Sequence, residues 1–140
     1  MTKTYIATAG ISGFIMILLG ALGSHLLTGN INPEQMNAFR IANQYQIIHT
    51  LAILALVYLQ RNITRTQSRL IYTLFVVGIV FFSFSIYLTS TMSFTHLNVG
   101  FLRGLAPVGG TFFMLGWLVI FWSGITYINP KKSRSHSTTK

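Results

Sequence analysis

Three of the four histidines and a single glutamate are the side chains of this sequence best suited to acid–base or metal chemistry. His25, His49, His96 and Glu34 offer imidazole and carboxylate groups, which zinc and copper accept as ligands, and Met92 offers a thioether. The histidines show no H-x-x-x-H spacing, so a shared site would depend on how distant segments meet. A metal site remains one hypothesis, but we predict none and interpret His25 and His49 as groups that satisfy hydrogen bonds between helices.

The shortage of carboxylates excludes most kinds of catalytic site. Glu34 is the only acidic residue, and the chain has no aspartate and no cysteine. A carboxylate pair, a Ser-His-Asp triad, an EF-hand and an acidic magnesium site are therefore impossible. Disulfides, thiol catalysis and thiolate zinc sites need cysteine and are excluded too. We predict that the protein is not an enzyme and carries no cofactor.

The composition of the chain indicates a membrane protein. Its 140 residues include 10 Lys or Arg and carry a net charge of +9, yet only 8% of positions are charged and 51% are hydrophobic. A soluble domain carries about 25% charged residues. A chain with so few charges cannot cover a globule of this size in water, so we place it in a lipid bilayer.

Four segments are candidates to cross the bilayer. Residues 5–27, 70–90 and 107–128 are uncharged and reach the roughly 20 residues that a spanning helix needs. Residues 47–59 are too short alone, but Asn32, Pro33, Glu34 and Gln35 before them form a capping-box helix start. A helix from there to Gln60 would be about 40 Å long, enough to cross the lipid core and project beyond it.

The pattern therefore predicts an all-α membrane protein, an antiparallel four-helix transmembrane bundle in one domain over residues 1–130. We place the spans at residues 5–27, 43–60, 70–90 and 107–128, with an amphipathic outer extension preceding the second span. Residues 131–140 form a basic tail that we expect to be disordered. An alternative is that residues 1–23 are a signal peptide cleaved after Ala21-Leu22-Gly23, but the apolar run is longer than a signal core.

Basic residues predict the orientation, because Lys and Arg are retained on the cytoplasmic side. With four spans, both termini and the middle loop share one side, and only Arg40 and Arg103 fall on the other. We therefore predict N-in and C-in, with Tyr45 and Tyr87 at the outer interface. The shared side holds the remaining basic residues: Lys3, Arg61, Arg65, Arg69, Lys131, Lys132, Arg134 and Lys140.

Small residues recur on three of the spans at spacings that allow close helix contact, which drives much of helix packing in lipid. The predicted packing positions are Gly13, Gly20, Ser24, Gly78, Ser85, Gly109 and Gly116. Polar side chains gather toward the predicted outer side, where Gln46 and His49 share one helix face. We predict that this face meets His25 and Ser24 in an interhelical network. The candidate polar cluster is His25, Tyr45, Gln46 and His49.

Four motifs in a fixed order resemble the YgdD/YwdK-like family of small four-span bacterial membrane proteins of unknown function. They are G-A-L-G-S-H at residues 20–25, N-Q-Y-Q-I-I-H-T-L-A at 43–52, F-S-F-S-I-Y-L at 82–88 and P-V-G-G-T-F-F-M-L-G-W at 107–117. The resemblance implies a multi-pass protein of the bacterial inner or plasma membrane, and no activity. The positions that match the family pattern are His25, Tyr45, Gln46, His49, Pro107 and Gly110. Phe84 departs from it, because a glycine is expected there.

The functional interpretation that follows is a non-enzymatic integral membrane protein whose polar cluster serves packing or partner binding. One alternative is a small-solute or metal-ion permease acting as an oligomer, and another is a holin-like or membrane-stress protein. The expected partners are the lipid bilayer, anionic lipids at the cytoplasmic face, and a second copy or another membrane protein. We expect no nucleic acid, because the basic loop and tail carry no folded nucleic-acid-binding motif.

The orientation is testable with reporter fusions. Fusions within residues 61–69 and after Lys131 are expected to report the same, cytoplasmic side, because both segments carry the retained positive charges. A fusion after His96 is the matched control and should report the opposite side. Opposite signals from the first two fusions would contradict the four-span topology.

Overall fold

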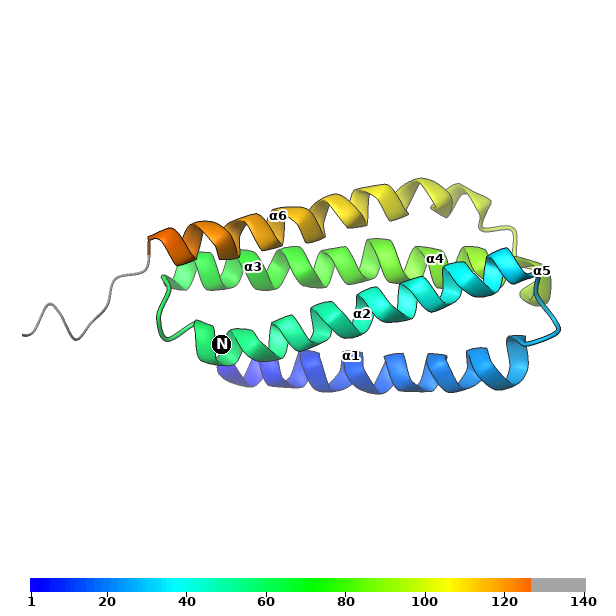
Figure 1. The fold of residues 1–140 in the computed structure, drawn as a ribbon, viewed down its shortest axis with the longest axis horizontal. Coiled ribbons are helices and arrows are strands. Elements are labelled where there is room, and N and C mark those ends of the chain that lie inside the picture. The colour runs from blue at the N-terminus through cyan, green and yellow to red at the C-terminus, as the bar shows by residue number, and fades with distance from the viewer. Residues whose placement is uncertain (127–140) are drawn as a thin grey trace, which may run out of the picture.

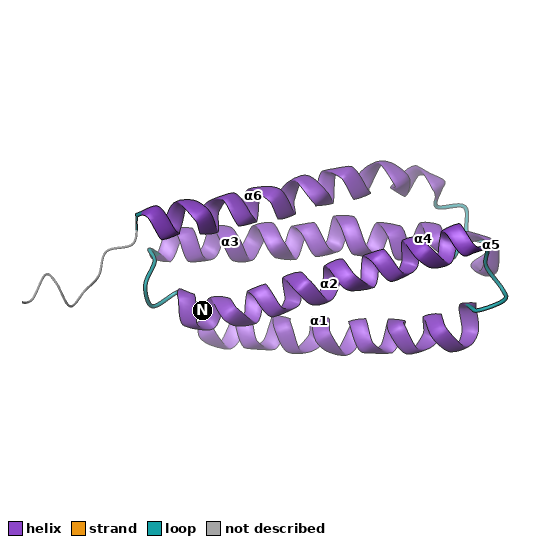
Figure 2. Ribbon diagram, in the orientation of Figure 1, coloured by secondary structure: helices purple, strands orange, loops and turns teal. Residues whose placement is uncertain are grey.

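The computed structural model describes residues 1–126, which form long helical rods that run back and forth along one axis (Figures 1 and 2). Every regular element in this part of the chain is helical, and four rods are long and apolar enough to cross a membrane. The rods run over Thr2–Leu27, Pro33–Leu59, Arg65–Ser90 and Gly100–Ile125. The prediction of four membrane-crossing helices is confirmed. Residue 128, the predicted end of the fourth span, and the tail 131–140 lie outside the described residues.

Each rod is built from one or more helical segments. The first is α1 (Thr2–Leu22), continued by a π-helical turn over Gly23–Leu27, and the second is α2 (Pro33–Leu59). The third joins α3 (Arg65–Gly78) and α4 (Ser85–Ser90) through a π-helical segment over Ile79–Phe84. A short helix α5 (Met92–Thr95) and a 3₁₀ turn (Gly100–Gly104) lead into α6 (Leu105–Ile125). We call the end of the bundle that carries α5 the α5 end.

The predicted capping box starts α2. The Asn32 side chain accepts a hydrogen bond from the Gln35 backbone at 2.8 Å, and the Gln35 side chain accepts one from the Asn32 backbone at 3.1 Å. Pro33 and Glu34 occupy the first turn, where a missing N–H and a negative charge are both favourable. Thr64 and Gln67 form the same box at the start of α3, so both loop-to-helix transitions are fixed by local hydrogen bonds.

The segment predicted as an outer extension of the second span is part of the bundle. Phe39 is 4% exposed and Ala42 is fully buried, and both pack with Leu27 and Tyr87 in a cluster near the α5 end. Because the first rod continues through Leu27, it covers this part of α2 instead of leaving it to project from the bundle. The predicted extension thus packs against the first and third rods, and its projection beyond the lipid core stays a prediction.

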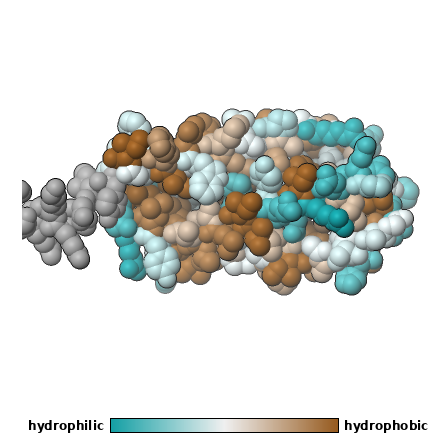
Figure 3. Space-filling view, in the orientation of Figure 1, coloured by the Kyte–Doolittle hydropathy of each residue, from teal (hydrophilic) through white to brown (hydrophobic). Residues whose placement is uncertain are grey.

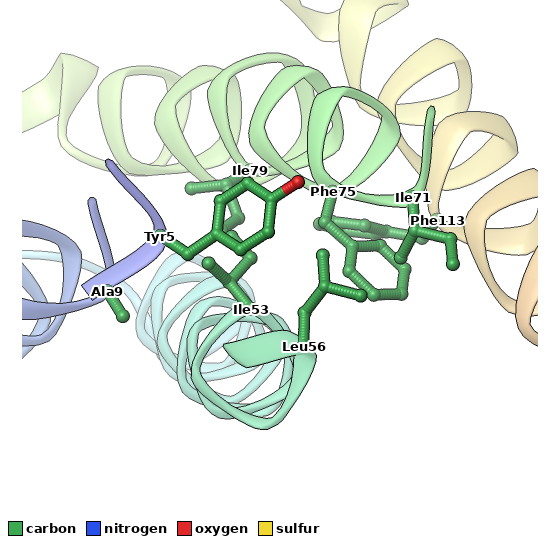
Figure 4. Close-up of a cluster of buried hydrophobic side chains, with 8 residues drawn as sticks. All are labelled: Tyr5, Ala9, Ile53, Leu56, Ile71, Phe75, Ile79 and Phe113. Atoms are coloured by element: carbon green, nitrogen blue, oxygen red, sulfur yellow. The ribbon is translucent and has the colours of Figure 1, made fainter. Parts of the chain in front are cut away.

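The apolar core lies toward the opposite end, where the chain begins. It contains two aromatic rings from the third and fourth rods and one from α1, packed with aliphatic side chains (Figure 4). Its members are Tyr5, Ala9, Ile53, Leu56, Ile71, Phe75, Ile79 and Phe113. Figure 3 shows apolar side chains along the flank and polar ones toward the α5 end. An apolar flank is what a lipid-embedded surface requires.

Glycines bring α6 into contact with the third rod. A Cβ atom added to Gly109 would overlap the backbone nitrogen of Phe82, and one added to Gly78 would lie 2.5 Å from the Phe113 ring. Gly116 is equally tight against Phe75, whereas Gly13 and Gly20 leave ordinary contact distances of 3.9 and 3.6 Å to α2. Of the predicted packing positions, those with the closest helix contacts thus lie between the third and fourth rods.

Two of the predicted packing positions hold hydroxyls that bond within their own helix. The Ser24 hydroxyl donates to the Ala21 carbonyl at 3.0 Å, and that of Ser85 donates to the Phe81 carbonyl. Ser24 is exposed and lines a hollow between α1 and α2, so it provides no close contact there. Ser85 is buried in the third rod.

The contact at Gly109 predicts a selective loss of stability. Gly109→Ala should lower the free energy of unfolding by about 1–3 kcal/mol, because the backbone of Phe82 cannot move aside as a side-chain end can. Thermal unfolding in detergent measures the change. Gly110→Ala is the matched control, because its Cβ would meet only side-chain atoms at 3.8 Å or more. Equal melting temperatures for the two variants would contradict the packing.

Candidate functional site

The centre of the bundle holds a glutamine whose side chain is entirely buried. Gln46 is 0% exposed and lies near the middle of α2. Its amide nitrogen donates to the backbone carbonyl and the hydroxyl of Ser12 at 3.1 and 3.3 Å, and its carbonyl accepts from the Tyr87 hydroxyl at 2.9 Å. One side chain of α2 is therefore bonded to α1 and to α4.

Two further side chains, those of Asn43 and Thr50, extend this arrangement, which we call the polar network. Ser12 and Thr50 share a hydrogen bond of 2.6 Å, and the Asn43 amide donates to the Met16 carbonyl and the Tyr87 hydroxyl at 2.9 and 3.2 Å. Within residues 1–126, every buried side-chain nitrogen and oxygen has a hydrogen-bond partner. A network whose members satisfy one another fixes the helix register and leaves no buried group seeking a ligand. Its members are Ser12, Asn43, Gln46, Thr50 and Tyr87.

His49 lies beside the polar network with both ring nitrogens occupied. Nδ1 lies 2.7 Å from the Tyr45 carbonyl, which only accepts, and Nε2 lies 3.2 Å from the Trp117 indole N–H, which only donates. These partners assign a neutral imidazole with its proton on Nδ1. The ring also stacks on Phe113, with 3.5 Å between centroids and 10° between planes. His49 therefore links α2 to α6 and has no free nitrogen for a metal.

His25 does not join this arrangement. It lies in the π-helical turn at the end of the first rod and is exposed. It follows Ser12, which faces Gln46, by 13 residues, or about 20 Å of helix at about 1.5 Å per residue. The predicted contact of Gln46 and His49 with His25 and Ser24 was therefore wrong. It placed the second span over residues 43–60, with Gln46 and His49 in its outer half, whereas α2 already packs in the bundle at Phe39, so that Gln46 lies opposite the middle of α1.

The described residues bring no three potential metal ligands among His, Cys, Asp and Glu into one group. Tyr87 is 4% exposed within the polar network, although aromatic patterning predicted it at the membrane interface. The sequence analysis also overlooked Ser12, Thr50 and Trp117. One signal was present: Asn43, Gln46 and Thr50 are spaced i, i+3 and i+7, which places three polar groups on one helix face.

An open groove of about 900 Å³ runs between α2 and α6, with Phe82 of the third rod at its base. Tyr45, 41% exposed, forms part of one wall, and its ring lies 4.6 Å from that of Phe82. The hydroxyls of Tyr5, Tyr72 and Tyr87 are hydrogen-bonded, but that of Tyr45 has no partner among residues 1–126. Most of the lining surface is apolar. The lining residues are Tyr45, His49, Phe82, Pro107, Gly110, Thr111, Phe113, Met114, Trp117 and Leu118.

Removing one hydroxyl tests the polar network. Tyr87→Phe should lower the free energy of unfolding by about 1 kcal/mol, because Gln46 loses the donor to its carbonyl and finds no water at this depth. Chemical or thermal unfolding in detergent gives the value. Tyr58→Phe removes the same atom from a ring that is 72% exposed and should have no effect. Equal losses in both variants would show that the network adds no stability.

Comparison with known proteins identifies the family. The family model described as "Protein of unknown function (DUF423)" matches residues 19–110. The chain is 36% identical over 131 residues to the UPF0382 inner membrane protein YgdD of Escherichia coli (strain K12), covering 91% of this chain and 92% of that protein. It is 28% identical over 129 residues to the UPF0382 membrane protein YwdK of Bacillus subtilis (strain 168), covering 90% and 99%. No solved structure matches. The chain therefore belongs to the UPF0382 family of small membrane proteins, as its four motifs and four membrane-crossing helices indicated.

Proposed function

We propose that this protein is a non-enzymatic membrane protein that binds a lipid acyl chain in the groove between α2 and α6. The observation that carries the proposal is the contrast between a closed interior and an open groove. The buried polar side-chain groups of residues 1–126 all have hydrogen-bond partners within the protein. The groove, by comparison, offers about 900 Å³ lined by aromatic and aliphatic side chains. Apolar cavities of this size are typical ligand sites.

The closed interior argues against a solute pathway through a single copy. Transport of a polar solute needs hydrogen-bonding groups that exchange partners along a route across the membrane. Here Gln46 and Tyr87 bind each other, and Asn43 and Gln46 donate to the backbone of α1, so these central groups are held in place by the protein itself. The polar network supports a structural role, and the groove remains as the surface for recognition.

Contacts between the two walls of the groove favour an acyl chain over another helix. A helix with its side chains is about 10 Å across. His49 and Trp117, from opposite walls, meet at 3.2 Å, and His49 stacks on Phe113 of α6. These contacts tie the two walls together, so a fifth helix cannot enter between them. A flexible hydrocarbon chain fits along such a groove, and Met114 adapts its shape to it.

Filling the groove tests the proposal. The wild-type protein, purified in mild detergent, is expected to retain lipid by native mass spectrometry. Gly110→Leu should lower the retained lipid severalfold, because its side chain occupies the groove while its Cβ meets only the Phe82 ring at 3.8 Å. Gly10→Leu is the matched control, because a Cβ there meets nothing within 4 Å.

Circular dichroism and a melting curve establish that each variant is folded. Met114→Trp, which fills the same groove from an exposed position, serves as a second variant if Gly110→Leu unfolds. Equal lipid retention by the wild type and a folded groove-filling variant would contradict the proposed function.

A further inference from the structure

A further hollow of about 210 Å³, lined mainly by polar residues and called the polar hollow below, lies at the α5 end of the bundle. It is formed by α2, α4 and the 3₁₀ turn before α6, which are the elements that continue the walls and base of the groove. Glu34 and Arg103 are both exposed there. Its lining residues are Glu34, Gln35, Ala38, Thr89, Ser90 and Arg103.

The polar hollow and the groove lie along one line. At about 100° per residue, Glu34, Ala38, Tyr45 and His49 fall within about 60° of one another on the surface of α2. On the opposite wall, Arg103 of the polar hollow precedes Pro107 of the groove by four residues, or about one turn. The same faces therefore pass from charged groups at the α5 end to aromatic groups near the centre.

The charges of the polar hollow suit a headgroup that carries both signs. Glu34 is the only acidic residue of the chain, and it shares the hollow with the basic Arg103. An ammonium group next to a carboxylate and a phosphate next to a guanidinium each form charge-assisted hydrogen bonds. An anionic headgroup without an amine would meet the repulsion of Glu34.

Tyr45 lies between the polar hollow and the deeper part of the groove. Its side chain is 41% exposed and lines the groove, and its hydroxyl has no hydrogen-bond partner among residues 1–126, so it can donate to a bound group. The ester carbonyl of a glycerophospholipid lies just below its phosphate, at the start of the acyl chain. A lipid whose phosphate is at Arg103 therefore brings an acceptor toward Tyr45.

We propose that the groove and the polar hollow together bind one glycerophospholipid with a primary amine and a phosphate in its headgroup, as in phosphatidylethanolamine. Glu34 receives the ammonium group, Arg103 the phosphate and Tyr45 an ester carbonyl, while one acyl chain lies against Phe82, Phe113 and Trp117. The inference rests on the proposed function and adds the identity of the headgroup.

Quenching of Trp117 fluorescence by brominated lipids tests the headgroup. In a Trp122→Phe background Trp117 is the only tryptophan, and it lines the groove. The protein is reconstituted with lipids brominated at mid-chain that differ only in headgroup. Phosphatidylethanolamine should quench at a concentration lower by a factor of about two to five than phosphatidylglycerol, as expected for a partly exposed ion pair. Phosphatidylcholine, whose quaternary amine has no N–H, should also quench less effectively.

Charge-removing variants assign the groups. Glu34→Gln should abolish the preference for phosphatidylethanolamine over phosphatidylglycerol, and Arg103→Gln should weaken quenching by both. Tyr45→Phe should weaken quenching by all three lipids to a similar extent. Arg40→Gln is the matched control, because Arg40 is an exposed arginine that lines the separate hollow between α1 and α2.

The outcomes separate the headgroup proposal from the function on which it rests. Equal quenching by all headgroups, unchanged in Glu34→Gln and Arg103→Gln, would overturn the headgroup proposal and leave the acyl-chain groove intact. Quenching that Gly110→Leu does not reduce would overturn both. Loss of quenching as the protein-to-lipid ratio rises would show that a second copy of the chain covers the groove and would also overturn both.

Discussion

A carboxamide in the middle of a lipid-embedded helix must find its hydrogen-bond partners inside the protein. The hydrogen bonds of Gln46 in the second rod therefore set the positions of the first and third rods. Its donors reach Ser12 of α1 and its acceptor receives the hydroxyl of Tyr87 from α4. Sliding either neighbour by one turn, about 5.4 Å, would break these bonds with no water to replace them. Packing of apolar side chains alone would not choose one register so strictly, because hydrocarbon side chains gain little from each other over lipid.

The same stretch of α2 contributes to both the polar network and the groove, because its polar residues lie on two different faces of the helix. Asn43, Gln46 and Thr50 face α1, whereas Tyr45 and His49 face α6. His49 connects the two regions: its Nδ1 proton is held by the backbone of its own helix, which leaves Nε2 to accept from Trp117. The contact between the two groove walls thus depends on a local hydrogen bond between residues four apart, His49 and Tyr45.

The fold was largely predictable from the sequence, whereas the site was predictable only in part. Uncharged runs and the Asn32–Gln35 capping box identify four helices because span length and local hydrogen bonding are properties of short segments. Which residue bonds to Gln46 depends on how α1 and α2 are aligned along each other. The spacing of polar residues within α2 therefore did not distinguish Ser12 from His25 as the partner. Tyr87 shows the same difficulty: a tyrosine near a helix end resembles an interfacial residue until the first rod is seen to extend past it. The N-in, C-in orientation rests on charge distribution and stays a prediction.

The tight glycine contacts between the third and fourth rods have a consequence for how the chain assembles. Residues 1–60 and 61–126 form two hairpins, and in each hairpin the two long helices pack against one another. The first hairpin already pairs the Gln46 amide nitrogen with Ser12 and leaves its carbonyl oxygen open. The hydroxyl of Tyr87 fills that position when the second hairpin docks. Insertion into the bilayer by hairpins would therefore leave the Gln46 carbonyl oxygen and the Nε2 atom of His49 exposed at the seam until the second hairpin docks.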